Sequence, residues 1–267
     1  MQTATGNGHV MKINISKYLI IPSIIICMIL SAGCAANHQN KEKASTHVNM
    51  GNAYLKSGQF PSALREFLAA QSLSQDDPEI HYYTGVSYYG NGLKEKAKKE
   101  FKTAVLLKPD YSEAHNYLGT IYLEESLYDN AIKQFELALA NIFYETPAIV
   151  LNNIGWAYYK KGDCKTALAK YESALKREPR TMIAPIIQKN MGIAYLADHN
   201  IVKAIRHLKR SIEMAPGMIE SRYWLGMSYL EIHDTKQAIE ELRAVVENNP
   251  ESELGLKAQK KLDDIVQ

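Results

Sequence analysis

Residues 151–179 read LNNIGWAYYKKGDCKTALAKYESALKREP, and this stretch decides the fold. It contains two helix-length segments separated by the turn signal KGD at 161–163, and Pro179 follows the second segment. Each segment carries one small residue, Gly155 in the first and Ala167 in the second. Small residues at facing positions allow two helices to approach closely, and large side chains fill the space beside them. The stretch therefore predicts a tightly packed helical hairpin.

The same pattern occurs six times along the chain. In every copy a tyrosine follows the glycine by three residues, and an alanine follows it by twelve. The steps between successive glycines are 34, 34, 36, 37 and 34 residues. The six sets are Gly51, Tyr54 and Ala63; Gly85, Tyr88 and Ala97; Gly119, Tyr122 and Ala131; Gly155, Tyr158 and Ala167; Gly192, Tyr195 and Ala204; Gly226, Tyr229 and Ala238. This period and these positions resemble the tetratricopeptide repeat, a helix-turn-helix unit of 34 residues.

The resemblance implies an all-α fold, a right-handed α-solenoid of six helix-turn-helix repeats with a C-terminal capping helix. Repeats one to three are expected in residues 44–145 and repeats four to six in residues 146–252, after an insertion. Residues 253–267 form one more amphipathic helix in the sequence pattern. A solenoid needs such a helix because its last repeat otherwise exposes an apolar face.

The N-terminal residues 1–33 predict a secretory signal peptide, with Met11 as the expected true start. Two lysines precede an apolar run at 18–30, and small residues follow it. The alternative is a membrane-spanning anchor. We favour a cleaved signal because the run is shorter than the roughly 20 residues that a bilayer requires, and Pro22 interrupts it.

The segment LSAGC at 30–34 resembles the lipobox of bacterial lipoproteins, although Ser31 stands where that family prefers leucine. The resemblance implies that Cys34 carries the lipid and becomes the mature N-terminus. Ala35 follows the cysteine, which by the family's sorting rule favours the outer membrane. More than one acyl chain would anchor the protein firmly. Residues 34–43 are then the lipidated cysteine and a polar tether that we expect to be flexible.

Charge and residue types disfavour several function classes. Before Cys34 there are two lysines and no acids, so the mature chain has 31 − 2 = 29 basic and 29 acidic residues. A net charge of zero argues against nucleic acid as a partner, because such binding needs a concentrated basic surface. Cys164 would be the last free cysteine, without a visible base partner. No paired carboxylates, phosphate loop or zinc spacing appear, so we predict no enzyme activity, no cofactor and no metal.

The histidines fall into repeat positions rather than a ligand set. His47, His81 and His115 each lie four residues before a repeat glycine. Successive repeats lie about 10 Å apart, which is too wide for one metal with bonds of about 2 Å. We therefore predict packing roles for these three. His199 and His233 stand where other repeats have turn glycines, and histidine tolerates positive φ better than most residues.

In the tetratricopeptide family the first helix of each repeat lines a concave groove. The matching positions here are mainly apolar and aromatic, with a few amides, which suits an amphipathic helix or an extended segment of another protein. Trp156 is the best single anchor because tryptophan dominates binding hot spots. Packing between repeats is the alternative role for each residue. The candidate groove residues are Tyr82, Val86, Tyr89, Asn116, Asn152, Trp156, Tyr159, Ile193, Tyr223 and Met227.

The lipobox, the six repeats and an aromatic loop at 142–144 before NNIGWAYY together resemble lipoproteins of type IV pilus biogenesis. That resemblance implies an outer-membrane anchor, a periplasmic location, and a partner that is a secretin or another envelope-machine subunit. Scaffolds for outer-membrane barrel assembly, cell-wall hydrolases or polysaccharide export are the alternatives. Loop 142–144 either packs back onto the repeats or contacts a partner.

Overall fold

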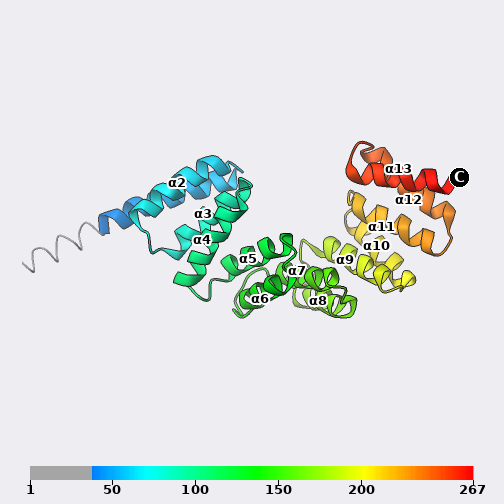
Figure 1. The fold of residues 1–267 in the computed structure, drawn as a ribbon, viewed down its shortest axis with the longest axis horizontal. Coiled ribbons are helices and arrows are strands. Elements are labelled where there is room, and N and C mark those ends of the chain that lie inside the picture. Colours follow the sequence, from blue (N-terminus) through cyan, green and yellow to red (C-terminus); the bar gives the residue numbers. More distant parts are fainter. Residues whose placement is uncertain (1–37, 267) are drawn as a thin grey trace, which may run out of the picture. The chain divides into compact units, whose positions relative to one another are not determined.

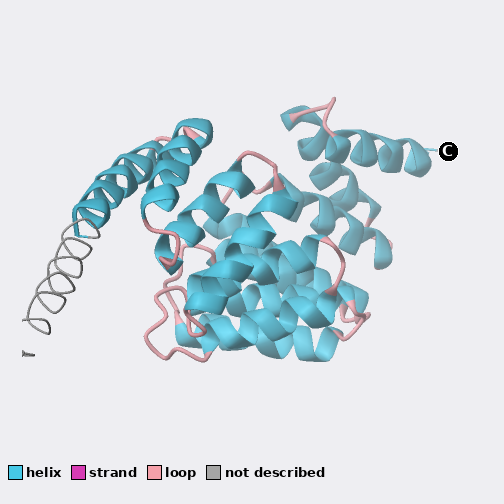
Figure 2. Ribbon diagram, turned by 60° about the vertical axis from the view of Figure 1, so that its left-hand side comes forward, coloured by secondary structure: helices cyan, strands magenta, loops and turns pink. Residues whose placement is uncertain are grey.

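The computed structural model describes residues 38–266, and every regular element in them is an α-helix (Figure 2). The predicted signal peptide and Cys34 lie outside these residues. A first helix covers residues 38–56, and the helices after it are labelled in Figure 1. They are α2 (Phe60–Leu73), α3 (Pro78–Gly90), α4 (Lys94–Leu107), α5 (Ser112–Glu124), α6 (Tyr128–Leu139), α7 (Pro147–Lys160), α8 (Cys164–Arg177), α9 (Ala184–Ala197), α10 (Ile201–Met214), α11 (Ile219–Glu231), α12 (Thr235–Asn248) and α13 (Glu253–Val266).

The helices pair in chain order as the repeat pattern predicts, which confirms the all-α solenoid class. Helices α5 and α6, α7 and α8, α9 and α10, and α11 and α12 pack as hairpins, and α13 packs on α12. The chain divides into two compact units, one ending at Asn91 and the other beginning at Gly92. This boundary differs from the predicted grouping at residue 146. Helices α6 and α7 pack directly on each other across that insertion.

The repeated small residues explain how the hairpins close. All six alanines of the repeat pattern have no exposed surface, and all six glycines are buried. A Cβ atom added at Gly155 would lie 2.5 Å from the ring of Tyr171 on the facing helix α8. Glycine at this position is therefore required by the close approach of the helices.

Each turn inside a hairpin contains one residue with a left-handed backbone conformation. It is glycine at Gly58, Gly92 and Gly162, with φ of 70°, 75° and 85°. His199 and His233 take the same conformation with φ of 58° and 60°, which confirms the turn role predicted for them. Ser126 is the third residue that replaces glycine here, with φ of 60°.

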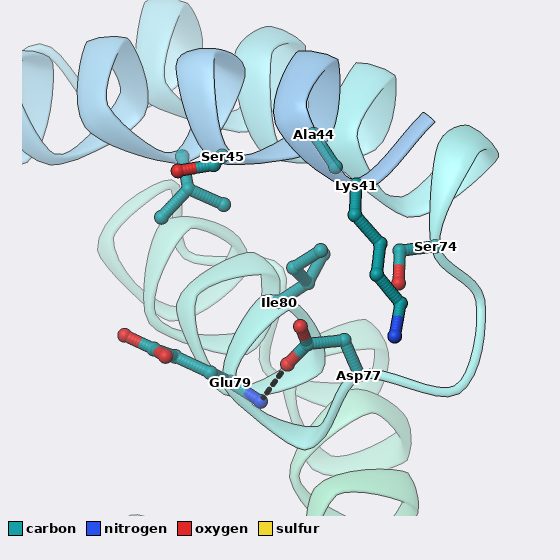
Figure 3. A pocket seen from close by; sticks show the side chains of 8 residues that line it. Lys41, Ala44, Ser45, Ser74, Asp77, Glu79 and Ile80 are labelled. Carbon is teal, nitrogen blue, oxygen red and sulfur yellow. Dashed lines mark hydrogen bonds between the residues drawn. The ribbon is translucent and has the colours of Figure 1, made fainter. Parts of the chain in front are cut away.

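The prediction of a flexible tether through residue 43 is wrong for its described part. Residues 38–43 continue the first helix. Ala44 is 3% exposed and packs with Ala70 and Ile80, and Lys41 lines a small cavity beside Asp77 (Figure 3). The segment Lys41-Glu42-Lys43 contains good helix formers, so the helix extends N-terminally from the packed alanine.

The largest core cluster in the second unit surrounds Tyr171, which has no exposed surface. Its ring occupies the position held by Phe67, Phe101 and Phe135 in the first three repeats. The Tyr171 hydroxyl is buried without a hydrogen-bond partner in the structure, and burial raises its pKa. This hydroxyl is desolvated without compensation.

We expect Tyr171→Phe to raise the free energy of unfolding by about 1 kcal/mol, because it removes an unpaired buried polar group and keeps the ring. Urea unfolding followed by circular dichroism measures the change. Tyr171→Leu is the control, since it also removes the hydroxyl but leaves unfilled volume and should lower stability. A loss of stability in Tyr171→Phe would mean that the hydroxyl has a partner.

Candidate interaction surface

The first helices α7, α9 and α11 of the second unit carry most of the predicted groove residues. Trp156 on α7 is half-buried. Its ring lies 5.0 Å from the ring of Tyr159, and the Lys160 ammonium lies 5.0 Å from the Trp156 ring. Tyr159 itself packs on the core cluster around Tyr171, and burial raises its pKa. Trp156 is therefore held by a fixed neighbour while part of its ring stays accessible.

Contrary to the prediction, Asn152 is not available to a partner. It is 8% exposed, and Asn190 on α9 is 5% exposed. The Asn190 side-chain amide donates a hydrogen bond of 2.9 Å to Asn152 Oδ1. The pair fixes α7 against α9, because two buried amides must satisfy each other where water is excluded.

Ile193 also lies inside the protein rather than on the surface, with 2% exposure. Helix α9 contacts α7 and α11 as well as its hairpin partner α10. These neighbouring helices cover side chains of α9 that the repeat pattern alone predicts to be exposed in the groove. The packing alternative applies to Ile193 and Asn152.

Tyr223 and Met227 on α11 are half-buried and retain accessible surface. The Tyr223 ring meets Trp224 edge-on at 5.5 Å, and Tyr223 also packs against the cluster of Leu242. Next to them, Lys189 on α9 forms an ion pair of 2.5 Å with Glu220 on α11. The accessible part of the surface is thus aromatic and apolar with a charged pair beside it.

Asn116 on α5 lies beside Tyr144 of the first insertion. It is half-buried, and its Oδ1 atom is buried without a hydrogen-bond partner. Tyr144 lies close by: burial raises its pKa, and hydrogen bonds from Thr146 and Asn116 oppose that rise. Tyr144 is 8% exposed and packs with Val150 and other core residues.

The insertion at 142–144 packs back onto the repeats through one residue only, and its contact with a partner stays a prediction. Tyr144 packs back onto the repeats. Ile142 and Phe143 remain 75% and 84% exposed. The loop therefore has one buried residue at its base and two apolar side chains at its tip.

The candidates Tyr82, Val86 and Tyr89 lie on α3, in the first unit. All three are half-buried. The ring of Tyr82 lies 5.1 Å from that of Tyr83.

A column of polar pairs was missed at the sequence level. In four repeats a polar residue four positions before the glycine bonds to one nineteen residues later, on the second helix of the same hairpin. The pairs are His47–Glu66 at 2.8 Å, His115–Gln134 at 2.8 Å, Gln188–His207 at 2.7 Å and Arg222–Glu241 at 2.9 Å. The signal was present in the complementary residue types at that spacing.

His81 uses different partners, with ring nitrogens 2.9 Å from Gln71 Nε2 and 2.8 Å from the Gln75 carbonyl. The histidines of this column are thus hydrogen-bonded within the repeats, in line with the predicted packing role. Cys164 is half-buried at the start of α8. Burial, followed by the carboxylates of Asp198 and Asp163, raises the pKa of its thiol, so the reactive thiolate is disfavoured.

In the described part of the chain, no helix has both the length and the apolar character needed to cross a membrane.

Models of the tetratricopeptide repeat match residues 51–92, 110–177 and 195–262. Together with the helical hairpins, these matches show that the chain belongs to the tetratricopeptide-repeat family. Proteins of this family are generally non-catalytic scaffolds that bind other proteins. No curated protein matches the chain.

The fold also resembles several solved structures. PilF of Pseudomonas aeruginosa has a TM-score of 0.71 at 16% identity, over 84% of this chain and 99% of its own. PilW, described as a widely conserved type IV pilus biogenesis factor, has a TM-score of 0.74 at 18% identity, over 81% and 98%. The Cut9–Hcn1 complex has a TM-score of 0.72 at 19% identity, over 88% of this chain and 45% of its own chain. At these identities the likeness concerns the fold.

Proposed function

We propose that the protein is an interaction scaffold for type IV pilus assembly, which binds a secretin subunit and assists its localisation and multimerisation. The fold similarity to PilF and PilW over nearly their whole lengths supports this assignment. The protein would be held by lipid at Cys34 on the periplasmic face of the outer membrane, and it would have no catalytic role. The lipobox at 30–34 supports the anchor.

The observation that carries the proposal is the accessible aromatic surface on α7 and α11. Trp156 is braced by Tyr159 and keeps part of its ring open, while Tyr223 and Met227 offer further apolar area. Rigid aromatic anchors bind with little loss of side-chain entropy. The secretin segment that fits this surface is an amphipathic helix or extended strand with apolar side chains on one face.

A photo-reactive amino acid at position 227 tests the partner directly. We expect it to cross-link to the secretin subunit in living cells that assemble pili. Val202, on α10 and 79% exposed, is the matched control, because it belongs to a second helix of a repeat and should give no such product.

Cross-linking at 227 to a barrel-assembly component, a hydrolase or a polysaccharide export pore would overturn the secretin assignment and select one of the alternative scaffolds. Equal products at positions 227 and 202 would overturn the surface assignment. The anchor is tested separately by mass spectrometry of the N-terminal peptide, in which an unmodified Cys34 would contradict lipidation.

A further inference from the structure

Among the described residues, the three side chains Met182, Phe143 and Ile142 form a distinctive group of exposed large apolar residues. They are 95%, 84% and 75% exposed. All three lie in the two insertions that lengthen the repeat spacing, between α6 and α7 and between α8 and α9. Leu106 and Val202, each 79% exposed, lie on helices instead. The extra residues of the array thus place apolar side chains in water.

The two insertions lie beside each other. Glu178, the residue that ends α8, accepts a hydrogen bond of 3.0 Å from the backbone N–H of Ala148 at the start of α7. This bond joins the end of the first insertion to the beginning of the second. The bases of the two loops therefore lie next to each other in the second unit.

The first loop is built to keep its tip exposed. The Phe143 N–H donates to Asn141 Oδ1 at 2.9 Å, and the Tyr144 N–H donates to the Asn141 carbonyl at 3.2 Å. Tyr144 is anchored in the core below. The turn and the anchor together hold Ile142 and Phe143 outward, although each could lose exposed apolar area by packing inward.

The second loop adds positive charge to the apolar edge. Lys176, Arg177 and Arg180 are exposed around it. Glu178 is half-buried and engaged by the Ala148 N–H, and Glu145 of the first loop is exposed, so the three cations outnumber the two acids around the loops. Apolar tips with adjacent cations match the interface of an anionic bilayer, where apolar groups enter the acyl boundary and cations meet phosphate.

The chain length outside the described residues brings a bilayer within reach. Four steps of the chain separate Cys34 from residue 38, where the first helix is already formed. Four residues span at most about 14 Å. A lipid at Cys34 would therefore hold residue 38 within about 14 Å of the membrane surface.

We propose that the edge formed by Ile142, Phe143 and Met182 inserts into the anionic lipid surface, as a second contact besides the lipid anchor. This inference rests on the lipid anchor of the proposed function. The contact would fix the orientation of the second unit and keep the aromatic surface of α7 and α11 turned to its partner.

The test uses the full lipidated protein in vesicles of phosphatidylethanolamine and phosphatidylglycerol. Cys164 is replaced by serine, and a single cysteine at position 142 carries an environment-sensitive fluorophore; position 202 is the control. We expect a blue shift and strong quenching by spin-labelled lipid at 142, several times greater than at 202. Phe143→Ser with Met182→Ser should reduce the quenching at 142, and phosphatidylcholine vesicles should weaken it.

Equal quenching at 142 and 202 in protein that floats with the vesicles would overturn the lipid contact. The same holds if the fluorophore at 142 shifts only when secretin is added. Failure of the anchor gives a different result, because unacylated protein would float only weakly with the vesicles, and flotation is measured before the fluorescence.

Discussion

Gly155→Ala is expected to lower the free energy of unfolding by about 1–3 kcal/mol, since overpacking a closed helix interface forces side chains or backbone to move. The added Cβ would lie 2.5 Å from the Tyr171 ring. That ring is fully buried and cannot rotate away without displacing the core around it. Urea unfolding of the two proteins, followed by circular dichroism, measures the difference.

Two other glycines give matched controls for this prediction. At Gly226 the new Cβ would lie 2.9 Å from Leu242 Cγ, and a leucine side chain adapts more readily than a ring, so Gly226→Ala should cost less. At Gly217 no atom lies within 4 Å of the added carbon, so the change should be near zero. Similar losses in all three variants would contradict the close-approach explanation.

The fold follows from the sequence because its information is periodic. A glycine and an alanine recur at the positions of Gly155 and Ala167 in every hairpin, and each pair is buried for the same steric reason. The left-handed turn residues, including His199 and His233, were predictable on the same basis. If the pattern is misread in one repeat, the other five repeats still predict the same hairpin.

The interaction surface is less predictable because its exposure depends on neighbouring repeats. Ile193 occupies a groove position by sequence, but contacts of α9 with α7 and α11 cover it. Asn152 appears as a free amide until Asn190, 38 residues later, is seen to bond to it. Such pairs have no fixed spacing in the repeat. The helical conformation of residues 38–43 also depends on the burial of Ala44 against α2 and α3.

The largest functional effect is expected from Trp156→Ala, which should weaken binding of the secretin subunit by about 30-fold or more, the loss typical of a tryptophan hot spot. Stability should change little, because Trp156 lies half-buried on the surface beside Tyr159. Binding of purified protein to the secretin subunit by calorimetry measures the effect.

Trp224→Ala is the informative comparison, because this second tryptophan of the chain packs against the cluster of Leu208, Leu225 and Tyr229. We expect it to lower the free energy of unfolding more than Trp156→Ala does and to affect binding less. The two variants thus separate an aromatic side chain used for recognition from one used for packing. Unchanged affinity in a folded Trp156→Ala protein would contradict the role of Trp156 as the anchor of the binding surface.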